Sequence, residues 1–214
     1  MAEGTTVTVD DLVAWIHRFC EVIGDHADEL TQLDSAIGDA DHGTNMRRGC
    51  RAAVEALAAA EPEDVTGFGR AIAMKIISTV GGASGPLYGS FFLALGTAGG
   101  STSSLDGVGT VAALKAAVEA VRSRGKAEPG DKTMLDALLP AIAAMEASLD
   151  AGGSLSDALE AGTTAAEQGM VATIPMLARK GRASYLGERS IGHQDPGATS
   201  SWLLIRSAAE TLAA

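Results

Sequence analysis

Apolar residues recur at helical spacing in one segment of this chain after another. A spacing of three or four residues places such side chains on one face of an α-helix, where they can pack against other helices. Alternating runs of β-branched and aromatic residues, which strands favour, are almost absent, and aromatic residues make up only 4% of the chain. We therefore predict an all-α bundle, with apolar stripes at residues 9–23, 72–80, 108–121, 135–149 and 202–212.

Glycine divides these stripes from one another. Many of the 26 glycines gather in four blocks, and glycine inside a helix costs up to about 1 kcal/mol relative to alanine. The stretch at residues 98–104, rich in Ala, Gly and Ser, is predicted to be a surface turn. No repeat or linker interrupts the chain, so residues 1–214 are expected to form one domain. Loops between helices are predicted at residues 38–49, 81–89, 125–130 and 181–197.

The formal net charge of −11 argues against nucleic acid as a partner, because binding a phosphate backbone needs a surplus of Lys and Arg. Anionic membranes are disfavoured for the same reason, and no apolar run approaches the roughly 20 residues that cross a bilayer. Residues 1–11 lack the basic and apolar regions of a secretory signal. Cys20 and Cys50 have no metal-ligand or redox spacing, so we predict reduced packing thiols in a soluble, cytoplasmic protein.

Three carboxylates fall close together in the sequence, at Asp34, Asp39 and Asp41, in a stretch that glycines can turn back on itself. If their side chains converge to about 5 Å, each pair repels by roughly 3 kcal/mol at an effective dielectric constant of about 20. Such a cluster needs a cation, and hard oxygen ligands on a short loop suit Mg²⁺. Helix capping by Asp39 or Asp41 is the simpler alternative, whereas the spacing lacks the ligand order of an EF-hand.

A glycine-rich block at residues 81–90 precedes a predicted helix at residues 91–95. Small residues let backbone amides approach an anion, the Ser84 hydroxyl adds a donor, and a helix start presents unpaired N–H groups. These features indicate a phosphate-binding loop, although the block lacks the Gly-Lys-Ser/Thr ending of a Walker loop.

Two further blocks carry much of the positive charge. Residues 124–136 combine a turn with a helix start, and residues 179–198 form a long basic stretch that ends where Pro196 can open the last helix. Half of the sixteen basic residues lie at 122–132 and 179–189, which indicates a local anion site, although basic helix ends in water would give the same pattern. Together the four blocks offer metal ligands, phosphate-binding amides and guanidinium groups, which phosphoryl transfer requires.

With these blocks the chain resembles the nucleotide-binding L subunits of bacterial dihydroxyacetone kinases, which are homologous to the C-terminal domain of ATP-dependent dihydroxyacetone kinases. The resemblance covers nearly the whole chain. It rests on the motifs LDxxIGDxDHGxNM, GGASGPLYG, GKAEPGDKTM and GRASYLGERSIGHQDPGA, in the order and spacing of that family. It implies an antiparallel barrel of eight helices, with an ADP or ATP nucleotide and two Mg²⁺ ions at one end.

The resemblance also implies a role for each matching position. Asp34, Asp39 and Asp41 correspond to magnesium ligands. Arg182 is expected to act in catalysis, by offsetting charge in the transition state, and to contact the nucleotide. Met134 is expected to form an apolar wall for adenine, unless it points into the core. The expected nucleotide contacts are His42, Gly43, Thr44, Asn45, Ala83, Ser84, Gly125, Met134, Arg182, Asp195, Pro196 and Gly197.

In that family, dihydroxyacetone is held on a separate K subunit, and outside the nucleotide loops this sequence offers no site for a carbonyl substrate. His17 and His26 are interpreted as structural, while His193 is expected either to orient Asp195 or to meet a partner. Because the chain stands without a K domain, it resembles subunits whose tightly bound ADP is rephosphorylated in place. The donor there is a phosphohistidine on a third, phosphotransferase-system M subunit.

Other functions stay open on the sequence alone. The same loops would serve an ATP-dependent two-subunit kinase for dihydroxyacetone or a related ketose. A regulator that binds magnesium nucleotide without turnover is a second alternative. A simple Mg²⁺- or Ca²⁺-binding module is a third, although it would have no use for the loop at residues 81–90. The sequence does not decide whether the chain forms a homodimer.

Overall fold

The computed structural model describes residues 6–213, and most of them lie in helices. Residues 1–5, which belong to the stretch predicted to lack a secretory signal, lie outside the described residues. The helices are α1 (Val9–Asp25), α2 (Ala27–Ile37), α3 (His42–Ala60), α4 (Val65–Thr79), α5 (Ser84–Gly99), α6 (Gly107–Gly125), α7 (Leu135–Asp150), α8 (Leu155–Ala172), the 3₁₀ helix η1 (Arg182–Ser190) and α9 (Pro196–Leu212).

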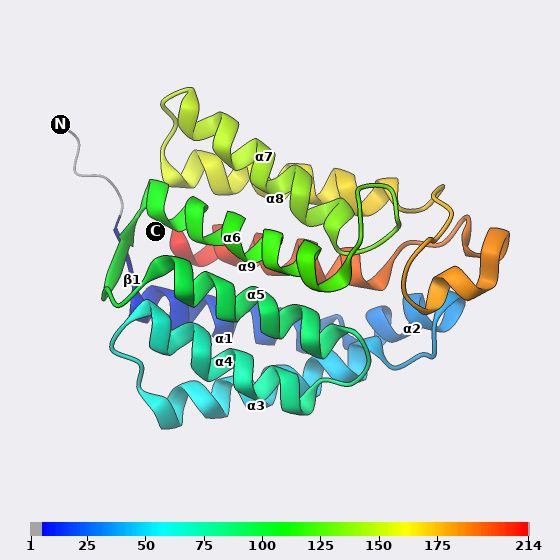
Figure 1. Ribbon diagram of the computed structural model, residues 1–214, viewed down its shortest axis with the longest axis horizontal. Coiled ribbons are helices and arrows are strands. Elements are labelled where there is room, and N and C mark those ends of the chain that lie inside the picture. The colour runs from blue at the N-terminus through cyan, green and yellow to red at the C-terminus, as the bar shows by residue number, and fades with distance from the viewer. Residues whose placement is uncertain (1–5, 214) are drawn as a thin grey trace.

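Eight of these helices form a closed ring (Figure 1). The order around the ring is α1, α3, α4, α5, α6, α7, α8 and α9, and α9 packs against α1 to close it. Neighbouring helices run in opposite directions, so that α3, α5, α7 and α9 all begin at the right-hand end in Figure 1. The shorter α2 packs against α3 and η1 at that same end. The predicted all-α, antiparallel eight-helix barrel is therefore confirmed.

Aromatic side chains from opposite sides of the ring meet in its centre. Trp15 of α1 lies 6.2 Å from Phe92 of α5, and Phe19 lies 6.4 Å from Tyr88, measured between ring centroids. The indole N–H of Trp15 donates a hydrogen bond to the Leu204 carbonyl at 3.0 Å, so its polar atom is paired despite complete burial. Across residues 6–213, no helix combines the length and the apolar character needed to span a membrane.

A two-stranded sheet, which the sequence did not predict, lies at the left-hand end of the ring. β1 (Thr6–Thr8) pairs antiparallel with β2 (Ser104–Asp106), and the strands lead directly into α1 and α6. Three residues per strand are too few to show the alternation that identifies a strand. The turn predicted at residues 98–104 runs from the end of α5 into β2. Val108, counted in a predicted stripe, is instead 66% exposed in the first turn of α6.

Two of the predicted glycine loops are α-helical for most of their length, and η1 occupies residues 182–190 of the loop predicted at 181–197. Residues 43–49 belong to α3, and residues 85–89 belong to α5. Glycine is needed there for close packing, because a Cβ atom on Gly43 would lie 1.9 Å from the carbonyl oxygen of Ala27. A Cβ atom on Gly85 would lie 2.4 Å from a backbone oxygen at the end of α4. These glycines let helices approach one another rather than turn the chain.

The two ends of the ring differ in how their helices begin. At the left-hand end, the four helix starts are each capped by a side chain that accepts a backbone N–H hydrogen bond, and the cap residues are Thr8, Asp64, Asp106 and Ser154. Among the described ring helices that start at the right-hand end, α9 has such a cap, whereas α3, α5 and α7 do not. The right-hand end therefore gathers helix starts whose partial positive charge favours an anion.

Candidate functional site

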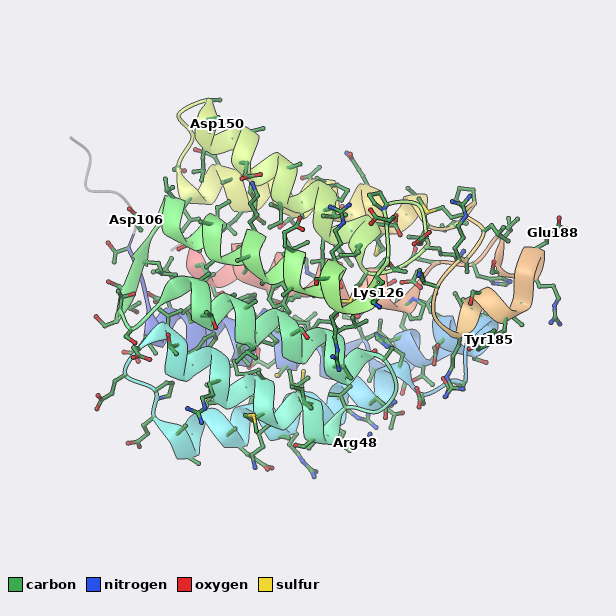
Figure 2. All side chains as sticks on the ribbon, viewed as in Figure 1. Arg48, Asp106, Lys126, Asp150, Tyr185 and Glu188 are labelled. Atoms are coloured by element: carbon green, nitrogen blue, oxygen red, sulfur yellow. The ribbon has the colours of Figure 1, made fainter. Side chains whose placement is uncertain are left out.

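The right-hand end of the ring holds a cavity of about 360 Å³. Its walls come from the α2–α3 turn, the start of α5, the end of α6, the loop before α7, the stretch that leads into η1, and the start of α9. Figure 2 shows Tyr185 and Glu188 on η1 at this end of the molecule, while Asp106 and Asp150 lie at the far end. The volume is within the range of small-molecule sites in proteins.

Three carboxylates line one side of the cavity, and the α2–α3 turn brings them together. Asp34 is buried in the last turn of α2, and Asp39 and Asp41 follow in the turn, where Ala40 adopts a φ of 61°. One oxygen from each carboxylate lies within 4.8 Å of the others. The Asp34 carboxylate accepts the backbone N–H of Asp41 at 2.8 Å and that of His42 at 3.1 Å. The turn is therefore folded around Asp34.

The donor set of this cluster fits a divalent cation. At about 5 Å, each pair of carboxylates repels by roughly 3 kcal/mol at an effective dielectric constant of about 20, so a cation would stabilise the turn. Carboxylate oxygens that face a cavity, with room for water and phosphate ligands, suit Mg²⁺. Asp41 is the N-cap residue of α3, but its side chain makes no cap hydrogen bond, so capping does not account for it.

Arg182 reaches this cluster from η1. Its Nη2 atom lies 2.9 Å from Oδ2 of Asp39, and both side chains are partly exposed. The ion pair offsets part of the negative charge of the three carboxylates. It also brings a guanidinium group to the cavity, where it can contact a phosphate with bidentate geometry.

The loop before α5 forms a second wall of the cavity. Gly82 turns the chain with a φ of 64°, and residues 81–83 face the cavity with no large side chain in the way. The Ser84 hydroxyl, at the start of α5, lies 3.3 Å from Nδ1 of His42. Small residues, a hydroxyl group and an uncapped helix start together provide a surface for phosphate.

A third wall is apolar and belongs to the α6–α7 region. Val121, Ala127 and Met134 line the cavity there, and Leu87 of α5 joins them. A Cβ atom on Gly125 would lie 3.2 Å from the Leu87 side chain, so glycine keeps this part of the wall open. Apolar and thioether side chains beside a polar pocket suit a flat ring such as a nucleobase.

His42 connects the cavity to a buried chain of hydroxyl groups that sequence reasoning missed. Its Nε2 lies 2.9 Å from Oγ of Ser200, which in turn lies 2.8 Å from the Tyr88 hydroxyl. The Ser200 hydroxyl also lies 3.1 Å from the Gly197 carbonyl, to which it can donate its single proton. With the Ser200 proton on Gly197, His42 donates from Nε2, and its Nδ1 can accept from Ser84. Tyr88 and Ser200 are 112 residues apart, so no local spacing links them.

The protonation states of His42 and Tyr88 follow from their burial. Burial lowers the pKa of His42 below its ordinary value, and the nearby carboxylates of Asp34 and Asp41 oppose this change. Burial also raises the pKa of Tyr88 to about 12, although its hydrogen bonds with the Ser200 and Ser201 hydroxyls lower it. Both groups are therefore neutral near pH 7.

Asp195 caps α9 at the inner end of the cavity. Its Oδ2 accepts the backbone N–H of Ala198 at 2.7 Å, and Pro196 opens the helix as predicted. Burial raises the pKa of Asp195 to about 7, although the hydrogen bond from Ala198 lowers it. The Asp136 carboxylate raises this pKa further, and the Lys132 ammonium lowers it. The carboxyl group of Asp195 is thus poised between its two protonation states near neutral pH.

The structure brings most of the predicted site residues to this one cavity. Gly43, Thr44 and Asn45 are the predicted positions that do not line it. They lie in the first turn of α3, where Thr44 is exposed and Asn45 is buried beside Gly81. The predicted residues that line the cavity are Asp34, Asp39, Asp41, His42, Ala83, Ser84, Gly125, Met134, Arg182, Asp195, Pro196 and Gly197.

The other three histidines lie away from the cavity lining. His17 is exposed on α1, and His26 ends that helix and lies 2.7 Å from the Glu29 carboxylate. The side chain of His193 is exposed, while its backbone carbonyl accepts a hydrogen bond from Lys132. Lys132 lines the cavity but received no role from the sequence.

Comparison with known proteins gives consistent relatives over most of the chain. The DAK2 domain family matches residues 36–210. The chain is 47% identical to the ADP-binding subunit DhaL of the PEP-dependent dihydroxyacetone kinase of Escherichia coli (strain K12), over 88% of this chain and 90% of that protein. It is 41% identical to the ADP-binding subunit DhaL of the PTS-dependent dihydroxyacetone kinase of Lactococcus lactis subsp. lactis, over 97% of this chain and 100% of that protein.

A solved structure has the same fold. The native form of the dihydroxyacetone kinase of C. freundii superposes with a TM-score of 0.70 and 25% identity, over 93% of this chain and 34% of that chain. The same kinase in complex with AMP-PNP and Mg²⁺ gives a TM-score of 0.70 at 24% identity, a likeness that shows the fold alone. The present chain thus spans about a third of the length of the solved kinase chains.

Proposed function

We infer the function of this chain from its family: it belongs to the DAK2 domain family, among the ADP-binding subunits of PEP-dependent dihydroxyacetone kinases. It is a phosphotransferase subunit that binds an adenine nucleotide and takes part in forming dihydroxyacetone phosphate. We propose that the cavity at the right-hand end of the ring is where the nucleotide binds. We further propose that residues 1–214 work as one domain in the cytoplasm.

One observation carries this proposal most directly. A single cavity combines three carboxylates within 4.8 Å of one another, an ion-paired guanidinium and an apolar wall. These are the separate requirements of a magnesium ion, a phosphate chain and a nucleobase. A simple cation-binding module would need only the first of them.

Each wall of the cavity then has a distinct task. Asp34, Asp39 and Asp41 would hold Mg²⁺, and we propose two ions, which would neutralise phosphate charge when bound. Ser84 and the start of α5 would orient the phosphates, and Arg182 would stabilise the charge that develops during transfer. Met134 and its apolar neighbours would hold the adenine. Arg182 would exchange its present ion pair with Asp39 for a phosphate contact.

The phosphoryl group must come from and go to partner proteins. We propose that a phosphohistidine-carrying phosphotransferase M subunit donates the group at this cavity, and that a K subunit presents dihydroxyacetone to it. This follows the names of the relatives, which are PEP- or PTS-dependent kinases with a dedicated ADP-binding subunit. The ADP would then stay in the cavity as a tightly held cofactor. A homodimer of this chain is compatible with the same scheme.

Nucleotide retention tests this proposal. The purified protein is dialysed against buffer with Mg²⁺, denatured, and its supernatant is analysed by anion-exchange chromatography. We expect about one ADP per chain. If the protein instead emerges empty, then binds and releases ATP and phosphorylates a ketose only with ATP, the chain belongs to an exchangeable ATP-dependent kinase. Binding without transfer, in the presence of both partners, would indicate a regulator.

A further inference from the structure

Lys132 occupies an unusual position for a charged side chain. It is only 1% exposed, and its backbone adopts a φ of 63°, a left-handed conformation that costs a residue with a side chain roughly 1 kcal/mol or more. Its Nζ atom is surrounded by five backbone carbonyl oxygens. The distances are 2.5 Å to His193, 2.8 Å to Ser190, 2.9 Å to Thr173, 3.2 Å to Met176 and 3.5 Å to Ile174.

The chemistry of this cage requires an ammonium group. All five partners are hydrogen-bond acceptors, and a charged lysine provides three donors and no acceptor. If the side chain were apolar, the carbonyl groups of Met176, Ser190 and His193 would lose this donor, which is unfavourable for the buried Ser190 carbonyl above all, whereas those of Thr173 and Ile174 would keep the N–H groups of Met176 and Gly192. A positive charge is therefore part of how this region folds. The same oxygen arrangement would otherwise suit a monovalent cation.

The five carbonyls come from two stretches of chain that meet at Lys132. One stretch, residues 173–178, leaves α8, and the other, residues 190–195, leads into α9. Between them lie residues 179–189, which include Arg182 and all of η1 except Ser190. We call these residues the η1 segment. The two stretches are also joined directly, because the N–H of Gly192 donates to the Ile174 carbonyl at 2.8 Å. One ammonium group thus fastens both ends of the η1 segment.

The η1 segment contacts the rest of the molecule mainly through a small apolar cluster, an ion pair and a backbone hydrogen bond. Its Ala183 and Leu186 pack with Ile37 and Ala178 in a small apolar cluster, and its Arg182 reaches Asp39 across partly exposed surface. The N–H of Arg179 donates to the carbonyl of Asp131, the residue before Lys132, at 3.0 Å. The position of Arg182 at the cavity therefore depends on how firmly the two ends of the segment are held.

We propose that Lys132 is a positioning residue, whose ammonium group in the carbonyl cage sets where Arg182 lies for phosphoryl transfer. The inference deepens the proposed function and rests on it. Lys132 acts through the backbone of the η1 segment, and it does not itself need to touch the nucleotide.

The test compares Lys132→Met with Lys126→Met. Lys126 is an exposed lysine that also has a positive φ and ends α6 in the same loop, so its substitution controls for loss of a charge near the site. Transfer is measured with the full chain, both partner subunits and ADP with Mg²⁺. For Lys132→Met we expect the transfer rate to fall by about 10²-fold, as for a group displaced by about 1 Å. We expect the dissociation constant of ADP to change far less, and Lys126→Met to behave as the wild type.

A double variant separates positioning from general loss of stability. If Lys132 acts through Arg182, the variant carrying both Lys132→Met and Arg182→Ala will transfer no more slowly than the slower single variant. If the two losses of transfer rate multiply in the double variant, or if Lys132→Met transfers at the wild-type rate, the inference is wrong. If Lys132→Met does not fold by circular dichroism, Ser190→Ala replaces it. The Ser190 hydroxyl joins the same two stretches, because it accepts the Ala178 N–H at 2.9 Å and donates to Gly187.

The outcome also distinguishes failure of this inference from failure of the proposed function. A wild-type chain that neither retains ADP nor supports transfer removes the proposed function. A wild-type chain that does both, beside a Lys132→Met variant that transfers equally fast, removes the role of Lys132 alone.

Discussion

The carboxylate of Asp34 accepts the backbone N–H of Asp41 at 2.8 Å, which closes the α2–α3 turn on itself. The same oxygen also accepts the N–H of His42, so this side chain holds the start of α3 as well as one corner of the carboxylate cluster. Asp39 has no comparable structural task, because its described contact is the exposed ion pair with Arg182. The two carboxylates should therefore respond differently to substitution.

We expect Asp39→Asn to weaken Mg²⁺-dependent ADP binding and to abolish transfer, while the free energy of unfolding of the nucleotide-free protein does not fall, because one negative charge leaves the carboxylate cluster. Asp34→Ala should weaken binding too, and should also lower the free energy of unfolding by about 2 kcal/mol, because two backbone N–H groups lose a charged acceptor. Calorimetric titration with ADP and Mg²⁺ and urea unfolding measure the two effects. Equal stability loss in both variants would contradict this division of roles.

Arg182→Ala should slow phosphoryl transfer more than it weakens nucleotide binding. A group that stabilises charge mainly in the transition state typically contributes about 10²- to 10³-fold to the rate. Arg189→Ala is the matched control, since Arg189 is an exposed arginine on η1 that does not line the cavity. Transfer rates and ADP dissociation constants are compared for both variants. Equal losses of rate and affinity in Arg182→Ala would show that this residue only docks the nucleotide.

The pKa of Asp195 makes the stability of the nucleotide-free protein depend on pH. Burial raises this pKa from 3.8 to about 7 in the folded state. Between those values the unfolded chain releases the proton while the folded chain keeps it, so stability falls as pH rises through that window and is then constant. The full effect is up to about 4 kcal/mol, because each pKa unit corresponds to about 1.4 kcal/mol.

Asp195→Asn should remove this part of the pH dependence, because an amide does not titrate but can still cap α9. We expect the wild type to lose stability relative to the variant between pH 4 and about pH 7. Asp106→Asn, which alters the cap at the exposed start of α6, serves as the control. Urea unfolding at a series of pH values gives the comparison. Parallel curves for wild type and Asp195→Asn would mean that Asp195 is ionised in the folded state throughout.

Gly43→Ala should destabilise the protein by about 1–3 kcal/mol, because its Cβ atom would lie 1.9 Å from the Ala27 carbonyl oxygen and push α3 away from α2. The shift should also weaken ADP binding, because Asp41 and His42 stand at the start of α3 and would move with it. Gly24→Ala is the matched control, with no atom within 4 Å of the new Cβ, and should stabilise α1 by about 0.5–1 kcal/mol. Thermal unfolding shows whether Gly43→Ala lowers the stability and Gly24→Ala raises it. A neutral Gly43→Ala would show that the two helices are not held in contact there.

Much of the fold and the site could be predicted because the relevant signals are local. Helical periodicity extends over single helices, and Asp34, Asp39 and Asp41 lie within one turn of chain, so their convergence needs no distant contact. The structure of the glycine blocks was harder to predict, because glycine occurs both in turns and where helices pack closely. Only the neighbouring helix distinguishes the two, as the contact of Gly43 with Ala27 shows.

Taken alone, the sequence determined the all-helical class, the apolar stripes of α1, α4, α6, α7 and α9, and the three clustered aspartates, because each depends on neighbours a few positions away. Only the tertiary structure decided that four helix starts meet at one end of the ring, that Ser200 and Tyr88 lie against His42, and that backbone carbonyls surround Lys132. A backbone carbonyl is chemically the same at every residue. Its role as a partner for a buried charge therefore depends on how the chain is folded around it, which residue types and spacing do not show.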